Sequence, residues 1–300
     1  MRELRDYSKG RSTAFFFLFL IALIISGSCS KNNDPRETQV SFLGHKGAGN
    51  NGYNDHNLEN TISAVREGVQ MLDGVEVDVQ MSLDGTIWLF HDEDNVNDLN
   101  CSGTTEVQSI PSMYDSEIEK IQLCHKTKKD RLYKLSEVIT FYKATPGGFF
   151  LSLDVKVSFP AEVMQVVGGK NAYLLRFADS LASVIGTVNP EKIMVEIDSR
   201  LFCEQLKSHP NAAAVKTFFM RYEPFDQKIE NAIELGYDGV SCNFTDETIT
   251  PEKIRKAQEM GLLVQLWTPY FRDEVTKTFS WNPDFIQTDN IRAKTGLNVK

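Results

Sequence analysis

Acidic side chains and a histidine are closely spaced in one stretch of the sequence, residues 75–92. Side chains on a strand point to alternate faces, so Glu76 and Asp78 would share one face while the neighbouring valines share the other. The Asp-Gly pair at 84–85 is typical of a tight turn, and the chain then returns as an apolar segment that ends at His91. Folding this hairpin places His91 roughly opposite Asp78, which predicts a metal site with an acid/base group beside it.

The expectation of a bound cation follows from the free-energy cost of burying charged side chains. Two carboxylates on one inner face of an apolar strand are unfavourable unless a positive charge lies between them. The same alternation is also typical of a sheet face that is exposed to solvent, and strands that end in His-Asp are common. This stretch alone leaves both interpretations open, so the elements that position it must decide between them.

Strand and helix patterns alternate along most of the chain. Strands are expected at 39–47, 75–81, 149–156, 192–197, 214–220, 237–242, 262–267 and 284–288. Helices are expected at 61–71, 135–142, 172–185, 201–208, 226–235, 251–260 and 272–279. If the return arm of the hairpin is an excursion above the sheet, this alternation predicts a parallel (β/α)8 TIM barrel with a β-hairpin excursion after its second strand. A doubly wound sheet is the second candidate, but no Gly-rich phosphate loop supports it. Residues 92–134 are expected to be irregular, with a short helix around 116–121.

Polar and aromatic residues lie at or near the carboxyl ends of the expected strands, where barrel enzymes build their active sites. They are His45, Glu76, Asp78, Asp154, Trp267 and Asp289. For Trp267, a place in the core and a place in the wall of a substrate pocket both remain open.

The N-terminal residues have the pattern of an export segment. Basic residues in 1–13 precede an unbroken apolar run at 14–25, which is too short for a comfortable membrane span but fits the core of a signal peptide. Small residues and then Cys29 follow, which predicts a lipoprotein signal at 1–28, lipidation of Cys29 and a tether at 29–38. An ordinary secretory signal with an incidental cysteine is the alternative. Residues 39–300 would form the barrel domain of an exported protein, anchored on the periplasmic or cell-surface side of a membrane.

The overall composition narrows the class of partner. A formal net charge of -9 argues against nucleic acid, whose phosphate backbone requires a basic surface. It does not exclude a small phosphate-bearing substrate, because a bound divalent cation reverses the local sign. Four further cysteines, at 101, 124, 203 and 242, allow three pairings, of which Cys101 with Cys124 is favoured because both fall in one irregular segment. The sequence gives no indication of an oligomeric state.

Several short motifs, taken in order and spacing, resemble the glycerophosphodiester phosphodiesterase family over about residues 41–292. They are His45-Lys46-Gly47, Glu59-Asn60-Thr61, Glu76-Val77-Asp78, Asp84-Gly85, His91-Asp92, Asp154-Val155-Lys156, Trp267-Thr268 and Thr288-Asp289. The resemblance implies a metal-dependent hydrolase that converts glycerophosphodiesters to glycerol 3-phosphate and an alcohol by histidine acid/base catalysis. It also implies one divalent cation, Mg²⁺ or Ca²⁺, which both prefer oxygen ligands.

The resemblance also assigns roles to individual residues. His45 and His91 correspond to the acid/base pair, and Lys156 to the lysine of the phosphate site. The metal ligands would be Glu76, Asp78 and Asp154, the last of these standing where the family usually has Glu.

Other positions are less defined by the resemblance. Lys46 is expected to hold the phosphate together with Lys156. It replaces an arginine of the family, which keeps the charge but loses the two-pronged grip on phosphate oxygens. Glu59 could ligate the cation, bond to Lys46 or simply precede a helix cap. Trp267 belongs with these substrate-side residues.

Two alternative functions remain open at this point. One is a phospholipase D-like or cyclising phosphodiesterase that acts on lysolipids. The other is a surface lipoprotein that binds phosphorylated ligands without turnover. The presence of two histidines and three carboxylates argues against the second alternative, because binding alone requires no acid/base pair.

Overall fold

The computed structural model describes residues 39–53, 56–93, 101, 109–186 and 188–297. Eight parallel strands form its centre, and each is hydrogen-bonded to the next, with the last strand paired to the first. In spatial order they are β1 (Ser41–Gly44), β2 (Gly74–Met81), β7 (Phe150–Val155), β8 (Ile193–Ile197), β9 (Lys216–Phe219), β10 (Gly239–Asn243), β11 (Leu263–Trp267) and β12 (Phe285–Thr288). The closed ring confirms the predicted TIM barrel.

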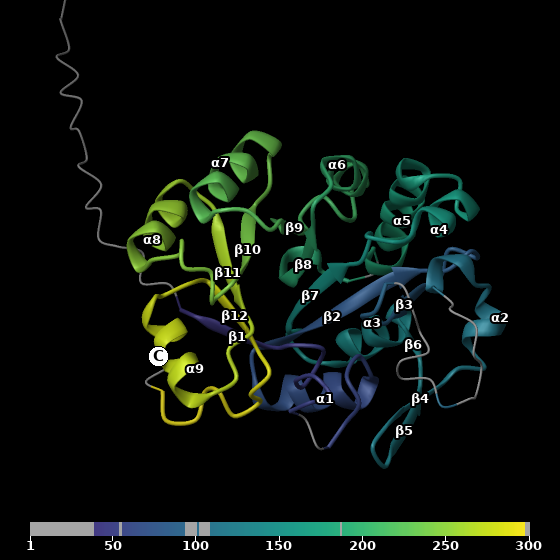
Figure 1. The fold of residues 1–300 in the computed structure, drawn as a ribbon, viewed down its shortest axis with the longest axis horizontal. Coiled ribbons are helices and arrows are strands. Elements are labelled where there is room, and N and C mark those ends of the chain that lie inside the picture. Colours follow the sequence, from purple (N-terminus) through teal and green to yellow (C-terminus); the bar gives the residue numbers. More distant parts are fainter. Residues whose placement is uncertain (1–38, 54–55, 94–100, 102–108, 187, 298–300) are drawn as a thin grey trace, which may run out of the picture. The chain divides into compact units, whose positions relative to one another are not determined.

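Helices surround this barrel on its outer side (Figure 1). The main ones are α1 (Ile62–Met71), α3 (Leu135–Ala144), α5 (Lys170–Ile185), α6 (Arg200–Ser208), α7 (Phe225–Leu235), α8 (Pro251–Glu259) and α9 (Arg272–Ser280). Local chemistry sets their ends: the hydroxyls of Thr61, Ser199 and Thr250 accept hydrogen bonds from the first turns of α1, α6 and α8. Gly236 ends α7 in the left-handed conformation, with φ 76°.

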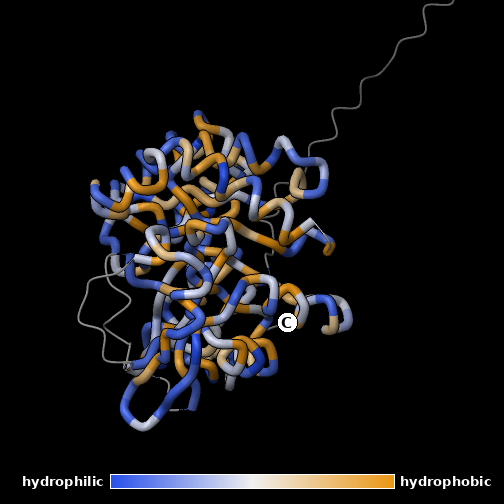
Figure 2. The backbone as a smooth tube through the Cα atoms, turned by 90° about the vertical axis from the view of Figure 1, so that its right-hand side faces the viewer, coloured by the Kyte–Doolittle hydropathy of each residue, from blue (hydrophilic) through white to orange (hydrophobic). Residues whose placement is uncertain are grey.

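The principal hydrophobic core lies between the strands and these helices. Every second side chain of a strand points outward to the helices, and on β2 these are Val75, Val77 and Val79, all fully buried. Hydrophobic residues are concentrated within the body of the domain, and the loops that project from it consist largely of hydrophilic residues (Figure 2). The opposite faces of the strands remain available for polar side chains inside the barrel.

The predicted hairpin after the second barrel strand is present. β3 (Ile87–Leu89) pairs antiparallel with the far end of β2, and β6 (Tyr133–Lys134) extends this excursion. The predicted register was wrong by one residue, because the Phe90 N–H, not that of His91, donates to the carbonyl of Asp78 at 3.1 Å. The cause is the turn, in which Ser82 and Thr86 close a three-residue loop that is centred on Asp84 rather than on the Asp-Gly bond.

The segment between β3 and α3 is more regular than its polar sequence indicates. It contains the 3₁₀ turn η2 (Ile110–Ser112), α2 (Asp115–Ile118) and a two-stranded hairpin of β4 (Gln122–His125) and β5 (Lys128–Arg131). The expectation of an irregular segment was therefore wrong for the hairpin, in which the charged strand β5 pairs with β4 in a regular antiparallel ladder. The disulfide between Cys101 and Cys124 is confirmed, and Cys203 and Cys242 are buried free thiols.

Two further short elements complete the described chain, the helix α4 (Ala161–Val166) and the 3₁₀ turn η3 (Pro190–Lys192). The predicted signal peptide, Cys29 and the tether lie outside the described residues. Within the part of the chain that is described, no helix combines the length and the apolar character needed to cross a bilayer.

Candidate active site

Three acidic side chains converge at the carboxyl ends of β2 and β7. Glu76 and Asp78 alternate with the outward-facing valines of β2, and the register of the two strands places Asp78 beside Asp154 on β7. One oxygen from each of the three carboxylates lies within 4.8 Å of the others. Glu76 and Asp78 are each only 1% exposed. The structure therefore brings together the three residues that the sequence assigned to a metal.

The hydrogen bonds of these carboxylates are incomplete. Asp78 accepts from the Asn60 amide at 2.8 Å and pairs with the Lys156 ammonium at 2.9 Å, while Glu76 Oε2 accepts from the Lys46 N–H at 2.8 Å. Glu76 Oε1 and Asp154 Oδ1 are buried and accept no hydrogen bond from the described residues. A buried carboxylate oxygen without a partner is unfavourable. The donor set, three oxygen ligands with two of them unsatisfied, fits a hard divalent cation.

Burial and neighbouring charges shift the pKa values of Glu76 and Asp78 in different directions. Burial raises the pKa of Glu76 well above its ordinary value, and the negative charges of Asp78, Glu196 and Asp154 add to the rise. Burial also favours the neutral form of Asp78, but the ammonium groups of Lys156 and Lys46 outweigh it and lower the pKa of that carboxyl. The site thus brings together more carboxyl groups than lysines.

Lys156 follows β7 and lies between two of the carboxylates. Its ammonium is 2.6 Å from Asp154 Oδ2 and 2.9 Å from Asp78 Oδ1. Burial alone would lower its pKa, but the charges of Asp154 and Asp78 raise the pKa well above the usual value, so the side chain stays positively charged. A permanent cation at this position is suited to binding phosphate.

His45 follows β1 and is oriented by an aspartate from the other end of the chain. Its Nδ1 lies 2.7 Å from Asp289 Oδ1, and its Nε2 lies 3.9 Å from Glu76 Oε2. The contact exists because β1 and β12 are neighbours in the closed barrel. Asp289 also accepts from the backbone and side-chain nitrogens of Asn50, at 2.9 and 2.8 Å. With Nδ1 engaged, Nε2 is the nitrogen left for proton transfer.

Close backbone packing holds Asn50 and Asp289 together. The neighbouring Gly49 has φ +98°, and a Cβ atom there would lie 2.6 Å from the Asp289 carbonyl oxygen. Only glycine accepts both the positive φ and this close approach without strain.

His91 is oriented in the same way, in the segment that follows β3. Its Nδ1 lies 2.8 Å from Asp92 Oδ1, and the hydrogen bond to His91 lowers the pKa of Asp92. The amide of Gln80, on β2, donates to the carbonyls of Phe90 and Asp92 at 3.0 and 2.9 Å. The buried end of β2 therefore fixes the segment that carries His91, whose side chain remains 42% exposed.

Lys46 and Glu59 form a supporting pair beside the site. Lys46 has a positive φ of 52°, and its ammonium lies 3.0 Å from Glu59 Oε1. Glu59 also accepts from the Asn51 N–H at 2.8 Å. Of the three alternatives for Glu59, the structure favours the bond to Lys46. Neither side chain belongs to the set that lines the carboxylate cavity.

The carboxylates and both histidines open onto one cavity of about 130 Å³. It is lined by His45, Glu76, Asp78, His91, Asp154, Lys156, Glu196, Met220, Tyr222, Trp267 and Gln287. Trp267 is thus a pocket wall rather than a core residue. A larger cavity of about 810 Å³ adjoins it and shares His91, Asp154 and Lys156 with it.

The sequence analysis gave no role to Glu196 or Asn60, two buried polar residues that form hydrogen bonds in this site. Glu196 lies on β8, where it is 1% exposed and accepts from Ser152 and Ser241 hydroxyls at 2.7 and 2.6 Å and from the Gln287 amide. The sequence of β8 is otherwise apolar, and a single carboxylate at a position that faces the barrel interior could have indicated a site residue. Asn60 donates to Asp78 and accepts from its N–H, and no spacing rule in the sequence pointed to this pairing.

Residues 45–293 match the model of the glycerophosphoryl diester phosphodiesterase family. A comparison with curated protein sequences finds no match.

Solved structures with this fold are similar to the chain at low sequence identity. A putative glycerophosphoryl diester phosphodiesterase from Silicibacter pomeroyi has a TM-score of 0.72 at 17% identity, over 86% of this chain and 92% of that one. A phosphodiesterase from Oleispira antarctica, in complex with the product sn-glycerol-3-phosphate, has 0.63 at 16%, over 84% and 94%. The glycerophosphodiester phosphodiesterase from Thermotoga maritima has 0.59 at 17%, over 84% and 96%.

Proposed function

Because the chain belongs to the glycerophosphoryl diester phosphodiesterase family, we propose that it hydrolyses glycerophosphodiesters to glycerol 3-phosphate and an alcohol. The observation that carries the proposal is the convergence of three carboxylates and two aspartate-oriented histidines on one cavity. The product bound to the Oleispira antarctica phosphodiesterase, sn-glycerol-3-phosphate, is consistent with this substrate class. A protein that only binds phosphorylated ligands would not need two histidines that are each held for proton transfer.

Glu76, Asp78 and Asp154 would hold one divalent cation, Mg²⁺ or Ca²⁺. Their two buried oxygens without hydrogen bonds, Glu76 Oε1 and Asp154 Oδ1, support this assignment. When bound, the cation supplies charge neutralisation for the non-bridging oxygens of the phosphate.

Lys156 would bind the same phosphate oxygens as a fixed positive charge. Lys46 would position Glu76 rather than bind the phosphate, because its ammonium is paired with Glu59 and its backbone N–H donates to Glu76. Trp267 would form one wall of the substrate pocket.

The two histidines would move the protons of the reaction. His45, held at Nδ1 by Asp289, accepts at Nε2 the proton of the nucleophile, which is a water or the glycerol 2-hydroxyl of the substrate. The nucleophile's oxygen forms a bond to phosphorus while the bond from phosphorus to the leaving oxygen breaks. His91 donates a proton to that oxygen, and the alcohol departs. The same geometry also permits the two histidines to exchange these roles.

Hydrolysis of glycerophosphocholine, with and without a chelator, tests the proposal. We expect turnover that the chelator abolishes and that added Mg²⁺ or Ca²⁺ restores. Phosphorus NMR of the product distinguishes direct attack by water from a cyclising reaction, which would release a cyclic phosphate. Absence of turnover on glycerophosphodiesters under every cation tested would overturn the proposal.

We further propose that the protein is exported and anchored to a membrane through lipidated Cys29. This rests on the basic, apolar and small-residue pattern of residues 1–29 alone. Mass spectrometry of the mature N-terminus in the native host decides it: a diacylated Cys29 that is lost in Cys29→Ala supports the anchor, and an unmodified N-terminus contradicts it.

A further inference from the structure

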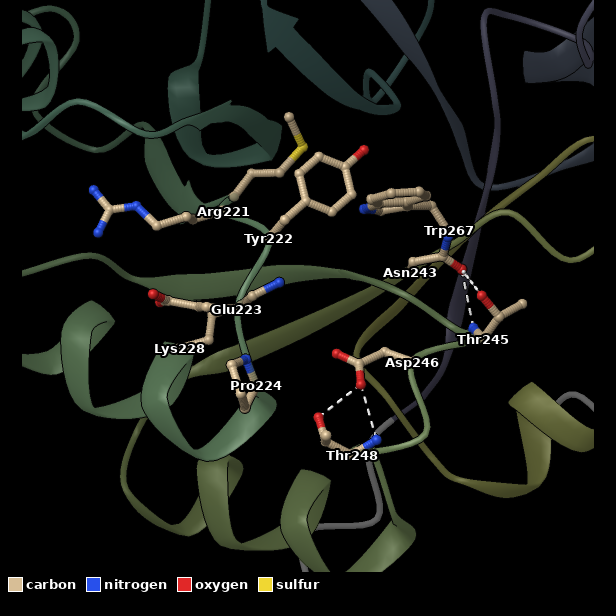
Figure 3. A pocket seen from close by; sticks show the side chains of 11 residues that line it. Arg221, Tyr222, Glu223, Pro224, Lys228, Asn243, Thr245, Asp246, Thr248 and Trp267 are labelled. Atoms are coloured by element: carbon tan, nitrogen blue, oxygen red, sulfur yellow. Dashed lines mark hydrogen bonds between the residues drawn. The ribbon is translucent and has the colours of Figure 1, made fainter.

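A second cavity lies beside the carboxylate site, at the loops that follow β9 and β10 and against α7 (Figure 3). Its volume is about 360 Å³, which is in the usual size range of small-molecule sites. Met220, Tyr222 and Trp267 line both this cavity and the one that contains the carboxylates. A diester whose phosphate lies at the carboxylates can therefore extend into it.

Two aromatic rings stand at the junction of the cavities. The rings of Tyr222 and Trp267 are nearly perpendicular, at 87°, with centroids 6.4 Å apart. Trp267 Nε1 is buried and donates to no acceptor among the described residues, and it lies on the edge of the indole that faces Tyr222 (Figure 3). An indole N–H normally finds an acceptor when buried, so this one is suited to an oxygen of a bound molecule.

The cavity also contains a buried cation with few partners. Lys228, on α7, is 4% exposed, and its ammonium donates to the Ser241 carbonyl at 3.2 Å and lies beside the Cys242 thiol. No carboxylate among the described residues forms an ion pair with it within 4.0 Å. Its ammonium points into the space between Tyr222 and Pro224 (Figure 3). A buried charge without a counter-charge is unfavourable, and an anionic ligand would relieve that cost.

Among the other charged residues of this cavity, Arg221 is neutralised by an ion pair, whereas the two carboxylates form hydrogen bonds with neutral groups. Arg221 forms a two-pronged pair with Asp198 at 2.8 Å. Glu223 accepts from the Asn231 amide at 2.9 Å. Asp246 accepts from the backbone and hydroxyl of Thr248, at 2.8 and 2.7 Å. Lys228 is therefore the cation of this cavity that has no ion-pair partner among the described residues.

We infer that this cavity receives the leaving alcohol of the diester and that Lys228 favours alcohols that carry a carboxylate. The inference rests on the proposed function for the position of the phosphate. Glycerophosphoserine and glycerophosphoethanolamine form a matched pair of probes, because their alcohols differ only in that carboxylate.

The experiment compares kcat/KM for the two substrates in the wild-type protein, Lys228→Met and Lys228→Arg. We expect the wild type to prefer glycerophosphoserine. Lys228→Met should lower the ratio of the two constants by about 10-fold or more, as expected for a lost charge-assisted hydrogen bond, and Lys228→Arg should retain part of it. The ratio is taken within each variant, so a smaller folded fraction does not change it. Lys216→Met, which removes a half-exposed lysine at the opposite end of β9, is the matched control and should keep the wild-type ratio.

An unchanged ratio in Lys228→Met would overturn the inference, and so would an equal loss for both substrates, since the cavity would then serve the glycerol that they share. If neither these two substrates nor glycerophosphocholine is hydrolysed, the proposed function fails, and calorimetric binding of glycerophosphoserine and glycerophosphoethanolamine tests the subsite separately. Tighter binding of glycerophosphoserine that Lys228→Met removes would still support the inference about the subsite. Equal binding of the two compounds to the wild type would overturn it.

Discussion

The imidazoles of His45 and His91 are each held at Nδ1 by an aspartate, although their settings differ. Asp289 reaches His45 from the far end of the sequence, while Asp92 is the next residue after His91. Both arrangements select the tautomer that leaves Nε2 for the substrate. The difference matters for variants, because Asp92 shares the local chain of its histidine, whereas Asp289 comes from a distant segment and also accepts hydrogen bonds from Asn50.

Replacing His91 tests the proton-transfer role directly. If His91 protonates the leaving alcohol, His91→Asn should lower kcat by about 10²–10⁴-fold. Circular dichroism should be unchanged, since the side chain is 42% exposed and lies at the cavity rim. A kcat close to that of the wild type would show that His91 is a structural partner of Asp92 and no more.

Replacing Asp289 tests the orientation of His45. Asp289→Asn keeps the shape but no longer enforces the required tautomer, so we expect a fall in kcat of at least about 10-fold and a displaced pH profile of kcat. Asp179→Asn is the matched control, because Asp179 holds His209 at 2.8 Å in a pair outside the site. Equal activity of the two variants would rule out a positioning role for Asp289.

At the scale of elements, the β2–β3 hairpin determines where His91 lies. β2 contributes two carboxylates to the site and, through Gln80, holds the backbone of residues 90–92. The extension beyond β3 then packs over the barrel through a separate buried cluster that includes Trp88, Ile110 and Leu123. The disulfide joins Cys101 to Cys124 on β4 and so links two parts of this extension.

Removing that disulfide should destabilise the extension. Cys101 and Cys124 are separated by 23 residues, a loop for which chain entropy predicts a loss of about 3 kcal/mol when the bond is absent. Denaturant unfolding of the Cys101→Ser, Cys124→Ser double variant measures the loss, and Cys203→Ser, which alters a buried free thiol, provides a comparison. A double variant as stable as the oxidised wild type would contradict this prediction.

At the scale of the molecule, barrel closure concentrates negative charge at one end of the strands. Glu76, Asp78, Asp154 and Glu196 come from three adjacent strands, and burial raises the pKa of Glu76 and of Glu196, with neighbouring carboxylates adding to both rises. The folded chain therefore contains a region that is unfavourable until positive charge enters it.

A bound cation should consequently stabilise the fold. Ligand linkage predicts about 2.7 kcal/mol at a concentration 100 times Kd, which for a domain of this size raises Tm by roughly 5–10 °C. Calorimetric scans with a chelator and then with Mg²⁺ or Ca²⁺ measure the rise, and Asp154→Ala should reduce it sharply. If the cations leave Tm unchanged in the wild type, the three carboxylates do not form a metal site.

What the sequence determined by itself was local. Apolar periodicity, caps and turn residues located most helices and strands to within a few residues, and two-residue alternation put Glu76 and Asp78 on one face. The same reasoning missed the β4–β5 hairpin. It also set the β2–β3 register one residue off, because packing around a turn determines which two residues close it.

Which distant groups come into contact depends on how the strands and helices pack in the folded chain. The His45–Asp289 contact spans 244 residues, and it exists because β12 closes the ring onto β1. The burial of Glu196, the pairing of Lys46 with Glu59 and the exposure of Lys228 to a second cavity depend likewise on how separate strands and helices pack. Local patterns fix the face of a strand on which a side chain lies, whereas the identity of its neighbours depends on contacts between segments that no short-range rule connects.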